Sequence, residues 1–410
     1  MARPNPDFDL FDVLESVEAV SPLEAVDAVT RKLAASLGSD RVCFLIADLA
    51  GRALVRLGPR SAAWAQAQLT GVDPAEIVPF SDKVAWAVVV DQQPVTVPDG
   101  DGWRVLAPVT QRGEVVGALE VHLPSEPDEA VVKRVCRAAH LLAFVVIANR
   151  RHTDLFEWGQ RTTPFELSAE MQRRLLPGAF TCEAGSATVA GWLEPAATIG
   201  GDTFDYSLGR DTLHVSLTDA MGHGVAAALT ATLCVGSLRN TRRAGGSLLE
   251  QAAAADAAVR DHAMGAFVTG LLGRLDLGRG VLGLVNAGHV LPVLMRGSVI
   301  EPVDLPANLP FGLNANRSYQ QTDVPLQVGD RLVLITDGMV DRQAAAVPLT
   351  DLLGRTRGLH PREATRQLAD AVIEAAGPVL ADDATILMLD WHGHHGRDRD
   401  SEAGADHPRR

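Results

Sequence analysis

The chain has 410 residues, of which 47% are hydrophobic and 21% are charged, and its formal net charge is -14. This length exceeds what one hydrophobic core usually organises, so we expect two folded domains. The acidic balance, with no basic stripe, excludes nucleic acid as the main partner, because binding to a polyanion depends on clustered Lys and Arg.

The four cysteines are spread widely along the chain, at Cys43, Cys136, Cys182 and Cys234. Their spacing fits neither a CxxC metal site nor a disulfide framework, and it predicts buried thiols in a reducing compartment. The N-terminus lacks the basic-then-apolar order of a signal peptide. The longest apolar run, residues 141–148, is too short to cross a bilayer. We therefore expect a cytoplasmic protein with no membrane insertion.

The first part of the chain predicts a helix followed by strands. Apolar residues at helical spacing from about 20 to 37 predict a helix that starts at Ser21 and Pro22 and ends at Gly38. Strand-like runs follow at 42–48, 53–58, 87–97, 103–113 and 114–123. The first two runs flank Gly51 and predict a hairpin. This order indicates an α+β domain with one central antiparallel sheet.

The segment RVLAPVTQRGEVVGALEVHL, followed by a helix, resembles the pattern of a GAF domain. That resemblance implies a GAF-like sensor domain over residues 16–150, preceded by an N-terminal extension at 1–15. Ligands vary widely within this family, so we assign no ligand-binding residue.

Two helices are predicted after the last of these strands. From Asp128 onward, apolar residues recur at alternating spacings of four and three, at Val131, Val135, Ala138, Leu142 and Val145. Such a seam is typical of a helix that packs against a partner. A second helix is predicted in FELSAEMQRRLLP, which ends at a proline. Either both helices are amphipathic core elements, or residues 128–176 form a signalling linker that makes a homodimer and transmits the state of the sensor.

Short strands, glycine turns and helices alternate after Gly178. The predicted elements are a strand at 212–220, a helix at 225–238, a hairpin of 267–277 with 280–288, and strands at 330–338 and 384–391. They indicate a second domain over 178–391 with two mostly antiparallel sheets flanked by helices. The tail at 392–410 has no periodicity and is predicted to be disordered.

Four acidic turns lie at or beside the ends of apolar runs in this second domain. They are Gly200-Gly201-Asp202, Asp219-Ala220-Met221-Gly222, Asp337-Gly338 and Asp382-Asp383. Carboxylates that converge at one rim of a sheet repel one another unless cations lie between them. Mg²⁺ and Mn²⁺ prefer such oxygen ligands and keep several waters. The pattern therefore predicts a site for two divalent ions.

A series of motifs between residues 166 and 391 resembles the PPM/PP2C-type serine/threonine phosphatases of the SpoIIE/RsbU branch. In the order of that family, the motifs are LSAEMQRRLLP, GGDTFD, LTDAMGHGVAAALTA, NAGHVLPVL, NLPFGL, GDRLVLITDG and DDATILML. The resemblance implies a PP2C-like αββα sandwich that binds two Mn²⁺ or Mg²⁺ ions, with room for a third. It implies a regulated catalytic domain behind the sensor domain.

The resemblance also assigns roles to individual residues. Asp219 would bridge both ions, the backbone carbonyl of Ala220 would be a further ligand, Asp202 would serve one ion, and Asp337 with Asp382 the other. Asp205 and Asp383 would support these ligands or hold an additional ion. The catalytic set would be Asp202, Asp219, Asp337 and Asp382, which act through a metal-activated water that attacks phosphorus in line.

The implied substrate is a phosphoserine or phosphothreonine protein, and in this branch it is usually a STAS-type anti-anti-sigma factor. Two other functions stay open at this point. One is a non-catalytic scaffold with a phosphatase-like fold, which would have no need of clustered carboxylates. The other is a hydrolase of small phosphate esters, which would not remove phosphate selectively from a folded phosphoprotein.

Overall fold

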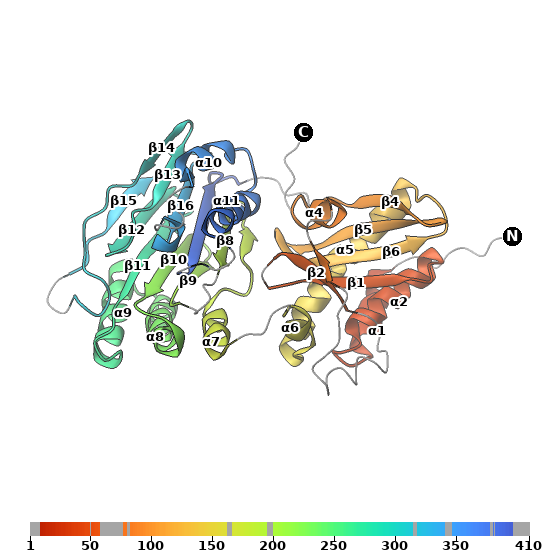
Figure 1. Ribbon diagram of the computed structural model, residues 1–410, viewed down its shortest axis with the longest axis horizontal. Helices are drawn as coiled ribbons and strands as arrows, with labels where there is room; N and C mark the ends of the chain where they lie inside the picture. The colour runs from red at the N-terminus through yellow and green to blue at the C-terminus, as the bar shows by residue number, and fades with distance from the viewer. Residues whose placement is uncertain are drawn as a thin grey trace. The chain divides into compact units, whose positions relative to one another are not determined.

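The computed structural model describes residues 9–49, 51–57, 77–79, 83–161, 166–194, 200–314, 318–340, 347–377, 380 and 382–396. The chain divides into two compact units between residues 164 and 165 (Figure 1). Each unit is described by itself below, and the expected domain bounds stay predictions. Most of the tail predicted to be disordered lies outside the described residues.

The first unit is built on one antiparallel sheet with the strand order β3-β2-β1-β6-β5-β4. Its strands are β1 (Val42–Ala47), β2 (Ala53–Leu57), β3 (Ile77–Pro79), β4 (Val95–Asp99), β5 (Gly102–Gln111) and β6 (Glu114–Leu123). Its helices are α1 (Leu10–Glu18), α2 (Ala25–Leu37), α4 (Lys83–Val89), α5 (Glu129–Asn149), the 3-10 turn η1 (Arg150–His152) and α6 (Leu155–Gly159). The predicted central antiparallel sheet is confirmed.

Alternation along β1 shows how helices cover both faces of this sheet. Phe44 and Ile46 join a buried cluster with α1, α2 and α5, whereas Leu45 and Ala47 join a second cluster with α4. Successive side chains of a strand point to opposite faces, so an unbroken apolar run predicts a sheet that is covered on both sides.

Three details of the sequence prediction differ in this unit. The segment AVVV at 87–90, predicted as part of a strand, lies in and just after α4, where Val88 and Val89 pack on the sheet. The helix expected from residue 20 begins at Ala25, because residues 21–24 form a turn closed by the amide of Glu24 on the carbonyl of Ser21. Helix α1 was not predicted and crosses the expected boundary at residue 16, and its Val13 is fully buried.

The seam predicted on α5 packs inside its own unit. Val135, Ala138, Leu142 and Val145 are buried in the cluster that α5 forms with the sheet and with α1 and α2, and Val131 packs against it. The interpretation as a core helix is confirmed for α5. The homodimer predicted through residues 128–176 would need a surface other than these buried residues, and it stays a prediction.

The second unit contains two antiparallel sheets. The first has the order β15-β12-β11-β10-β9 and the second β14-β13-β16-β17-β8-β7. The strands are β7 (Thr181–Glu183), β8 (Ala187–Glu194), β9 (Thr203–Leu208), β10 (Thr212–Ala220), β11 (Val268–Asp276), β12 (Val281–Ala287), β13 (Val293–Arg296), β14 (Val299–Pro302), β15 (Thr322–Pro325), β16 (Arg331–Ile335) and β17 (Ala384–Trp391). The helices are α7 (Leu167–Leu175), α8 (Gly224–Arg243), α9 (Leu248–His262), the 3-10 turn η2 (Asp337–Met339), α10 (Leu349–Arg355) and α11 (Pro361–Ala376).

These elements form four layers, which confirms the predicted αββα sandwich (Figure 1). Leu387 and Leu389 of β17 lie in the core between the two sheets, while Ile386 and Met388 pack against α10 and α11. On the other sheet, Leu271 faces the core between the sheets and Leu272 faces the layer of α7, α8 and α9. The alternation therefore buries both faces of each sheet.

None of the helices in the described ranges combines the length and the apolar composition needed to span a membrane.

Candidate functional site

The acidic turns meet at one end of the sandwich. Strands β9 and β17 begin at this end, and β10 and β16 finish there, as the pairings Thr203 with Thr218 and Ile335 with Ile386 require. The two sheets are linked at this end by the hydroxyl of Thr385, which donates to Asp202 Oδ2 at 2.5 Å. The loops before β9 and β17 and after β10 and β16 thus bring together Asp202, Asp219, Asp337, Asp382 and Asp383.

Asp202 is the most constrained of these residues and is only 2% exposed. Burial raises its pKa well above the usual range, and the charges of Asp219 and Asp383 raise it further. The hydroxyls of Thr385 and Thr336 act in the opposite direction. The chain therefore holds this carboxyl group in place while disfavouring its ionised form.

Asp219 at the end of β10 is mostly buried. Burial raises its pKa to about 7, assisted by the negative charges of Asp337, Asp382 and Asp383. A pKa this high means that the negative electrostatic potential at Asp219 disfavours its ionised form. A bound cation would lower the free energy of the ionised form. The negative potential made jointly by these aspartates is the main electrostatic feature of the site.

Asp383 is anchored by neighbours from two other segments. Gln172 Nε2 on α7 donates to Asp383 Oδ2 at 2.6 Å and to the backbone carbonyl of Asp202 at 2.8 Å. The amide of Gly200 donates to Asp383 Oδ1 at 3.2 Å. Asp382 accepts from the amide of Asp383 at 2.8 Å. Asp337 and Asp382 are themselves exposed, so the site contains both fixed and accessible carboxylates.

Three glycines of the acidic turns are required by close contacts. A Cβ atom on Gly201 would lie 2.4 Å from the carbonyl oxygen of Ala220, and one on Gly338 would lie 2.0 Å from that of Asp383. A Cβ on Gly200 would lie 2.8 Å from Asp383 Oδ2. Any other residue would push the acidic loops apart.

Asp205 lies outside this group and has a different environment. Its carboxylate accepts from Arg239 at 2.9 Å and from Arg242 at 3.0 Å, both on α8. Arg239 also donates to the carbonyl of Leu175. Two arginines thus compensate the charge of Asp205, and its role as a support for the ligands or as a ligand of an additional ion stays a prediction.

The remaining five carboxylates fit hard divalent ions by their chemistry. In the described ranges, no three His, Cys, Asp or Glu side chains converge closely enough to hold one ion by themselves. Mg²⁺ and Mn²⁺ sites commonly use one or two carboxylates per ion and complete the shell with water. The donor set therefore suits ions that keep much of their hydration, and the assigned ligand roles stay predictions.

Several residues of the site were not assigned by sequence reasoning. Gln172 lies within the motif LSAEMQRRLLP, but its contacts across 30 and 211 positions appear only in the fold. Thr336 directly precedes Asp337, and Thr385 lies two residues after Asp383, which is a usable sequence signal for residues that position carboxylates.

Thr269 connects His289 to the acidic group. Thr269 is paired directly with Asp219 on the neighbouring strand, and its hydroxyl lies 2.8 Å from His289 Nδ1. Asn286 fixes the backbone of His289 through both its amide and its carbonyl oxygen. Burial lowers the pKa of His289 to about 4, opposed in part by the backbone of Ile335. These contacts hold the histidine at the rim of the sheet, next to the strand position opposite Asp219.

A sandwich with clustered aspartates at one end is the arrangement of a PP2C-type phosphatase domain. Residues 209–392 match the model of Stage II sporulation protein E (SpoIIE), and residues 21–146 match the model of the GAF domain. The second unit is thus a phosphatase domain of the SpoIIE family, and the first unit contains a GAF domain.

The individual relatives have low sequence identity to this chain. The protein named phosphoserine phosphatase RsbU from Bacillus subtilis (strain 168) is 22% identical over 237 residues, which are 55% of this chain and 69% of that protein. The RsbU and RsbW domains of Rv1364c from Mycobacterium tuberculosis are 24% identical, with a TM-score of 0.47, and the match covers 53% of this chain and 62% of that one. The SiaA-PP2C domain of Pseudomonas aeruginosa is 23% identical, with a TM-score of 0.47, and the match covers 54% and 93%.

Proposed function

We propose that the protein is a metal-dependent phosphatase that removes phosphate from serine or threonine of a signalling protein, under control of its GAF domain. The observation that carries the proposal is the group of five carboxylates at one end of the sandwich, in which the pKa of Asp219 is raised to about 7. A chain that gathers so many acids at one place, where their charges raise the pKa values of Asp202 and Asp219, benefits from a cation there.

The residues that would hold two Mn²⁺ or Mg²⁺ ions are Asp202, Asp219, Asp337, Asp382 and the backbone carbonyl of Ala220, with Asp383 close by. Bound ions would supply an activated water and offset the charge of the phosphoryl oxygens. The chain itself contributes orientation, since Thr385 fixes Asp202 and Gln172 fixes Asp383. Such fixed ligands need little rearrangement when the substrate arrives.

The proposed substrate is the phosphoserine form of a STAS-type anti-anti-sigma factor. This step is supported by membership of the SpoIIE family and by the name of the Bacillus subtilis relative. The GAF domain is the proposed site of regulation, because it is a separate folded unit that contributes none of the acidic residues.

The proposal is tested by phosphate release from that phosphoprotein in Mn²⁺. The variant Asp219→Asn keeps the shape of the side chain but removes a charge that the ions would share. We expect it to lower the rate about 100-fold or more, and we expect EDTA to abolish the rate. Asp211→Asn is the matched control, because this exposed aspartate lies in the β9–β10 turn at the opposite end of the domain and should leave the rate unchanged.

Two outcomes would replace the proposal by the alternatives. Hydrolysis of p-nitrophenyl phosphate but of no phosphoprotein would favour a hydrolase of small phosphate esters. Binding of Mn²⁺ without hydrolysis of either substrate, in the full chain and in the phosphatase domain alone, would favour a scaffold.

A further inference from the structure

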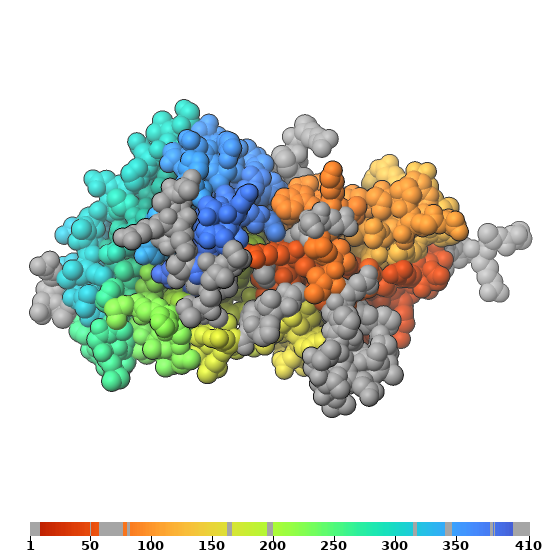
Figure 2. All heavy atoms as spheres, viewed as in Figure 1, coloured from red at the N-terminus to blue at the C-terminus, as the bar shows by residue number. Residues whose placement is uncertain are grey.

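Thr269 is the direct neighbour of Asp219 across the strands β10 and β11. Leu217 and Leu271, each two positions away along its strand, lie in the core between the sheets, so Asp219 and Thr269 point toward the other sheet as well. The opposite face of their sheet is covered by α8 and α9, which are green in Figure 2. Directly opposite side chains have Cβ atoms about 4.5–5.5 Å apart, so the hydroxyl of Thr269 lies within reach of the carboxylate of Asp219.

The carboxylate of Asp219 nevertheless accepts no hydrogen bond within the described ranges. Asp202 differs, because the hydroxyl of Thr385 donates to it at 2.5 Å. A threonine hydroxyl beside a buried carboxylate is well placed to donate to it, as Thr385 does. The hydroxyl of Thr269 must therefore have another acceptor.

That acceptor is His289, whose Nδ1 lies 2.8 Å from Thr269 Oγ1. Burial lowers the pKa of His289 to about 4, so the ring is neutral near pH 7, with one nitrogen as donor and the other as acceptor. The backbone carbonyl of Ile335 also acts on the ring and opposes part of this lowering.

The carbonyl of Ile335 decides which ring nitrogen carries the hydrogen. A carbonyl oxygen can only accept, and it repels the lone pair of a nitrogen, so the nitrogen that faces it is the protonated one. Nδ1 is turned to Thr269, which leaves Nε2 for the hydrogen. Nε2 is buried and forms no well-aligned hydrogen bond in the part of the chain that the structure describes. Nδ1 then accepts the single hydroxyl hydrogen of Thr269.

The loop after β12 holds His289 in this place. The amide of His289 donates to Asn286 Oδ1 at 2.7 Å, and Asn286 Nδ2 donates to the carbonyl of His289 at 3.0 Å. Asn308 in turn donates to the backbone carbonyl of Asn286 at 2.9 Å. The imidazole is thus a fixed acceptor beside β11.

We propose that His289 is a positioning residue of the acidic group: it accepts the hydroxyl hydrogen of Thr269 and so keeps the oxygens of Asp219 free for divalent cations. This inference rests on the proposed function. A hydroxyl that donated to Asp219 would occupy a lone pair that a cation could use. With its hydrogen committed to His289, the oxygen of Thr269 acts toward the site only as an acceptor, which suits the waters that Mg²⁺ and Mn²⁺ retain.

The test measures the Kd for Mn²⁺ by isothermal titration calorimetry on the full chain, which needs no phosphatase activity. His289→Phe keeps a ring but removes the acceptor. We expect the Kd to rise about tenfold, because the hydroxyl of Thr269 turns to Asp219. The double variant His289→Phe/Thr269→Val lacks this hydroxyl, and its Kd should return to within about threefold of the wild-type value. His289→Asn, whose amide oxygen can replace Nδ1, should bind Mn²⁺ like the wild type.

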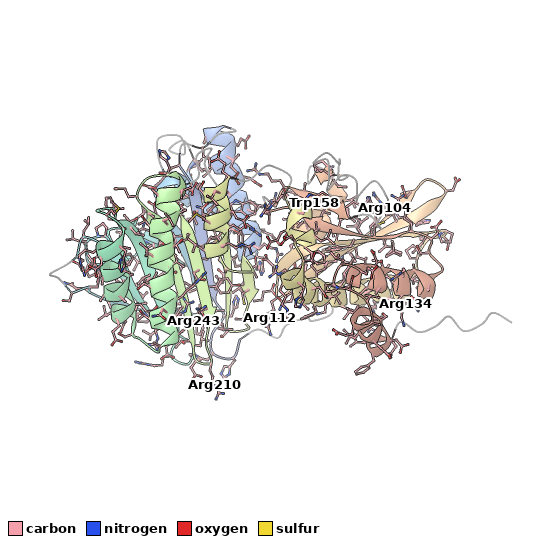
Figure 3. All side chains as sticks on the ribbon, turned by 90° about the horizontal axis from the view of Figure 1, so that it is seen from below. Arg104, Arg112, Arg134, Trp158, Arg210 and Arg243 are labelled. Carbon is pink, nitrogen blue, oxygen red and sulfur yellow. The ribbon has the colours of Figure 1, made fainter. Side chains whose placement is uncertain are left out.

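His392→Phe is the matched control. His392 Nε2 lies 2.8 Å from Thr188 Oγ1, the same distance as in the pair of Thr269 and His289. Thr188 pairs with Asp390 near the end of β17, away from the acidic group. The β9–β10 turn with Arg210, labelled in Figure 3, also lies at the end away from the acidic group. This variant should leave the Kd for Mn²⁺ unchanged.

Two results would overturn the inference. One is an unchanged Kd in His289→Phe, with a cooperative thermal transition to show that the variant folds; His289→Ala takes its place in the comparison if it does not fold. The other is a double variant that binds as weakly as His289→Phe, because His289 would then act through the packing of its loop and not through Thr269. A wild type that binds no Mn²⁺ would instead overturn the proposed function, and this inference with it.

Discussion

At the scale of residues, Asp219 and Asp205 show how surroundings separate two aspartates that look alike in the sequence. Asp205 lies between two arginines of α8, whereas Asp219 faces three further carboxylates. The acidic turns themselves are predictable, because Asp-Gly pairs at strand ends are visible in the sequence. The arginine pairing of Asp205 is not, because its partners are 34 and 37 positions away and meet it only when α8 packs on the sheet that contains β9.

The raised pKa of Asp219 predicts a pH dependence of metal binding. Between its ordinary pKa of 3.8 and about 7, the metal-free native state holds a proton that the unfolded chain has released. Native stability therefore falls as the pH rises through this window. Bound Mn²⁺ replaces that proton, so it should stabilise more strongly at high pH.

Thermal melting at pH 5.5 and pH 8.0 measures this effect. We expect saturating Mn²⁺ to raise the Tm of the phosphatase domain by roughly 5–10 °C at pH 8.0, and by clearly less at pH 5.5. Asp219→Asn, which cannot ionise, should lose most of the difference between the two pH values. Equal shifts of Tm at both pH values in the wild type would contradict the expectation.

At the scale of elements, α7 reaches the acidic group through one side chain. Gln172 is 3% exposed and uses the same Nε2 for Asp383 and for the carbonyl of Asp202. Sequence periodicity predicted α7 as a helix, and it predicted β10, β17 and the β11–β12 hairpin closely, because their apolar residues alternate or form runs of strand length. It missed α1 and mistook α4, because short apolar stretches fit a strand as well as a buried helix.

Replacement of Gln172 by Leu should raise the concentration of Mn²⁺ needed for activity and lower kcat at a fixed Mn²⁺ concentration by roughly 10- to 100-fold. The KM for p-nitrophenyl phosphate should change little, since Gln172 orients a carboxylate and is buried away from solvent. Gln251→Leu is the matched control, because Gln251 is also 3% exposed and donates to a backbone carbonyl, but on α9. If both variants behave alike, the contacts of Gln172 serve packing alone.

At the scale of the whole molecule, the two units have separate cores, and all five acids of the site belong to the second one. The number of domains and their order were predictable from length and motifs. The surface against which the apolar residues of α5 pack was not predictable. A heptad-like spacing is the same whether the partner is a second chain or the sheet of the same domain.

The fragment 166–396 should therefore fold alone and hydrolyse p-nitrophenyl phosphate with Mn²⁺ at a rate within about threefold of that of the full chain in its active state. A cooperative thermal transition and the rate itself are the measurements. An unfolded fragment would show that the GAF unit contributes to the stability of the phosphatase domain. Light scattering on the fragment and on the full chain would show which unit, if either, associates with a second copy.

The contact between Thr385 and Asp202 joins residues 183 positions apart, and it closes the acidic end only after both sheets have paired. Contacts between residues so far apart in the sequence form late, because the chain must lose the entropy of loop closure before the contact can stabilise it. An ion held by residues from both sheets would then act after the rate-limiting step of folding. Such an ion would prolong the lifetime of the native domain by slowing its unfolding, and it would leave the folding rate unchanged.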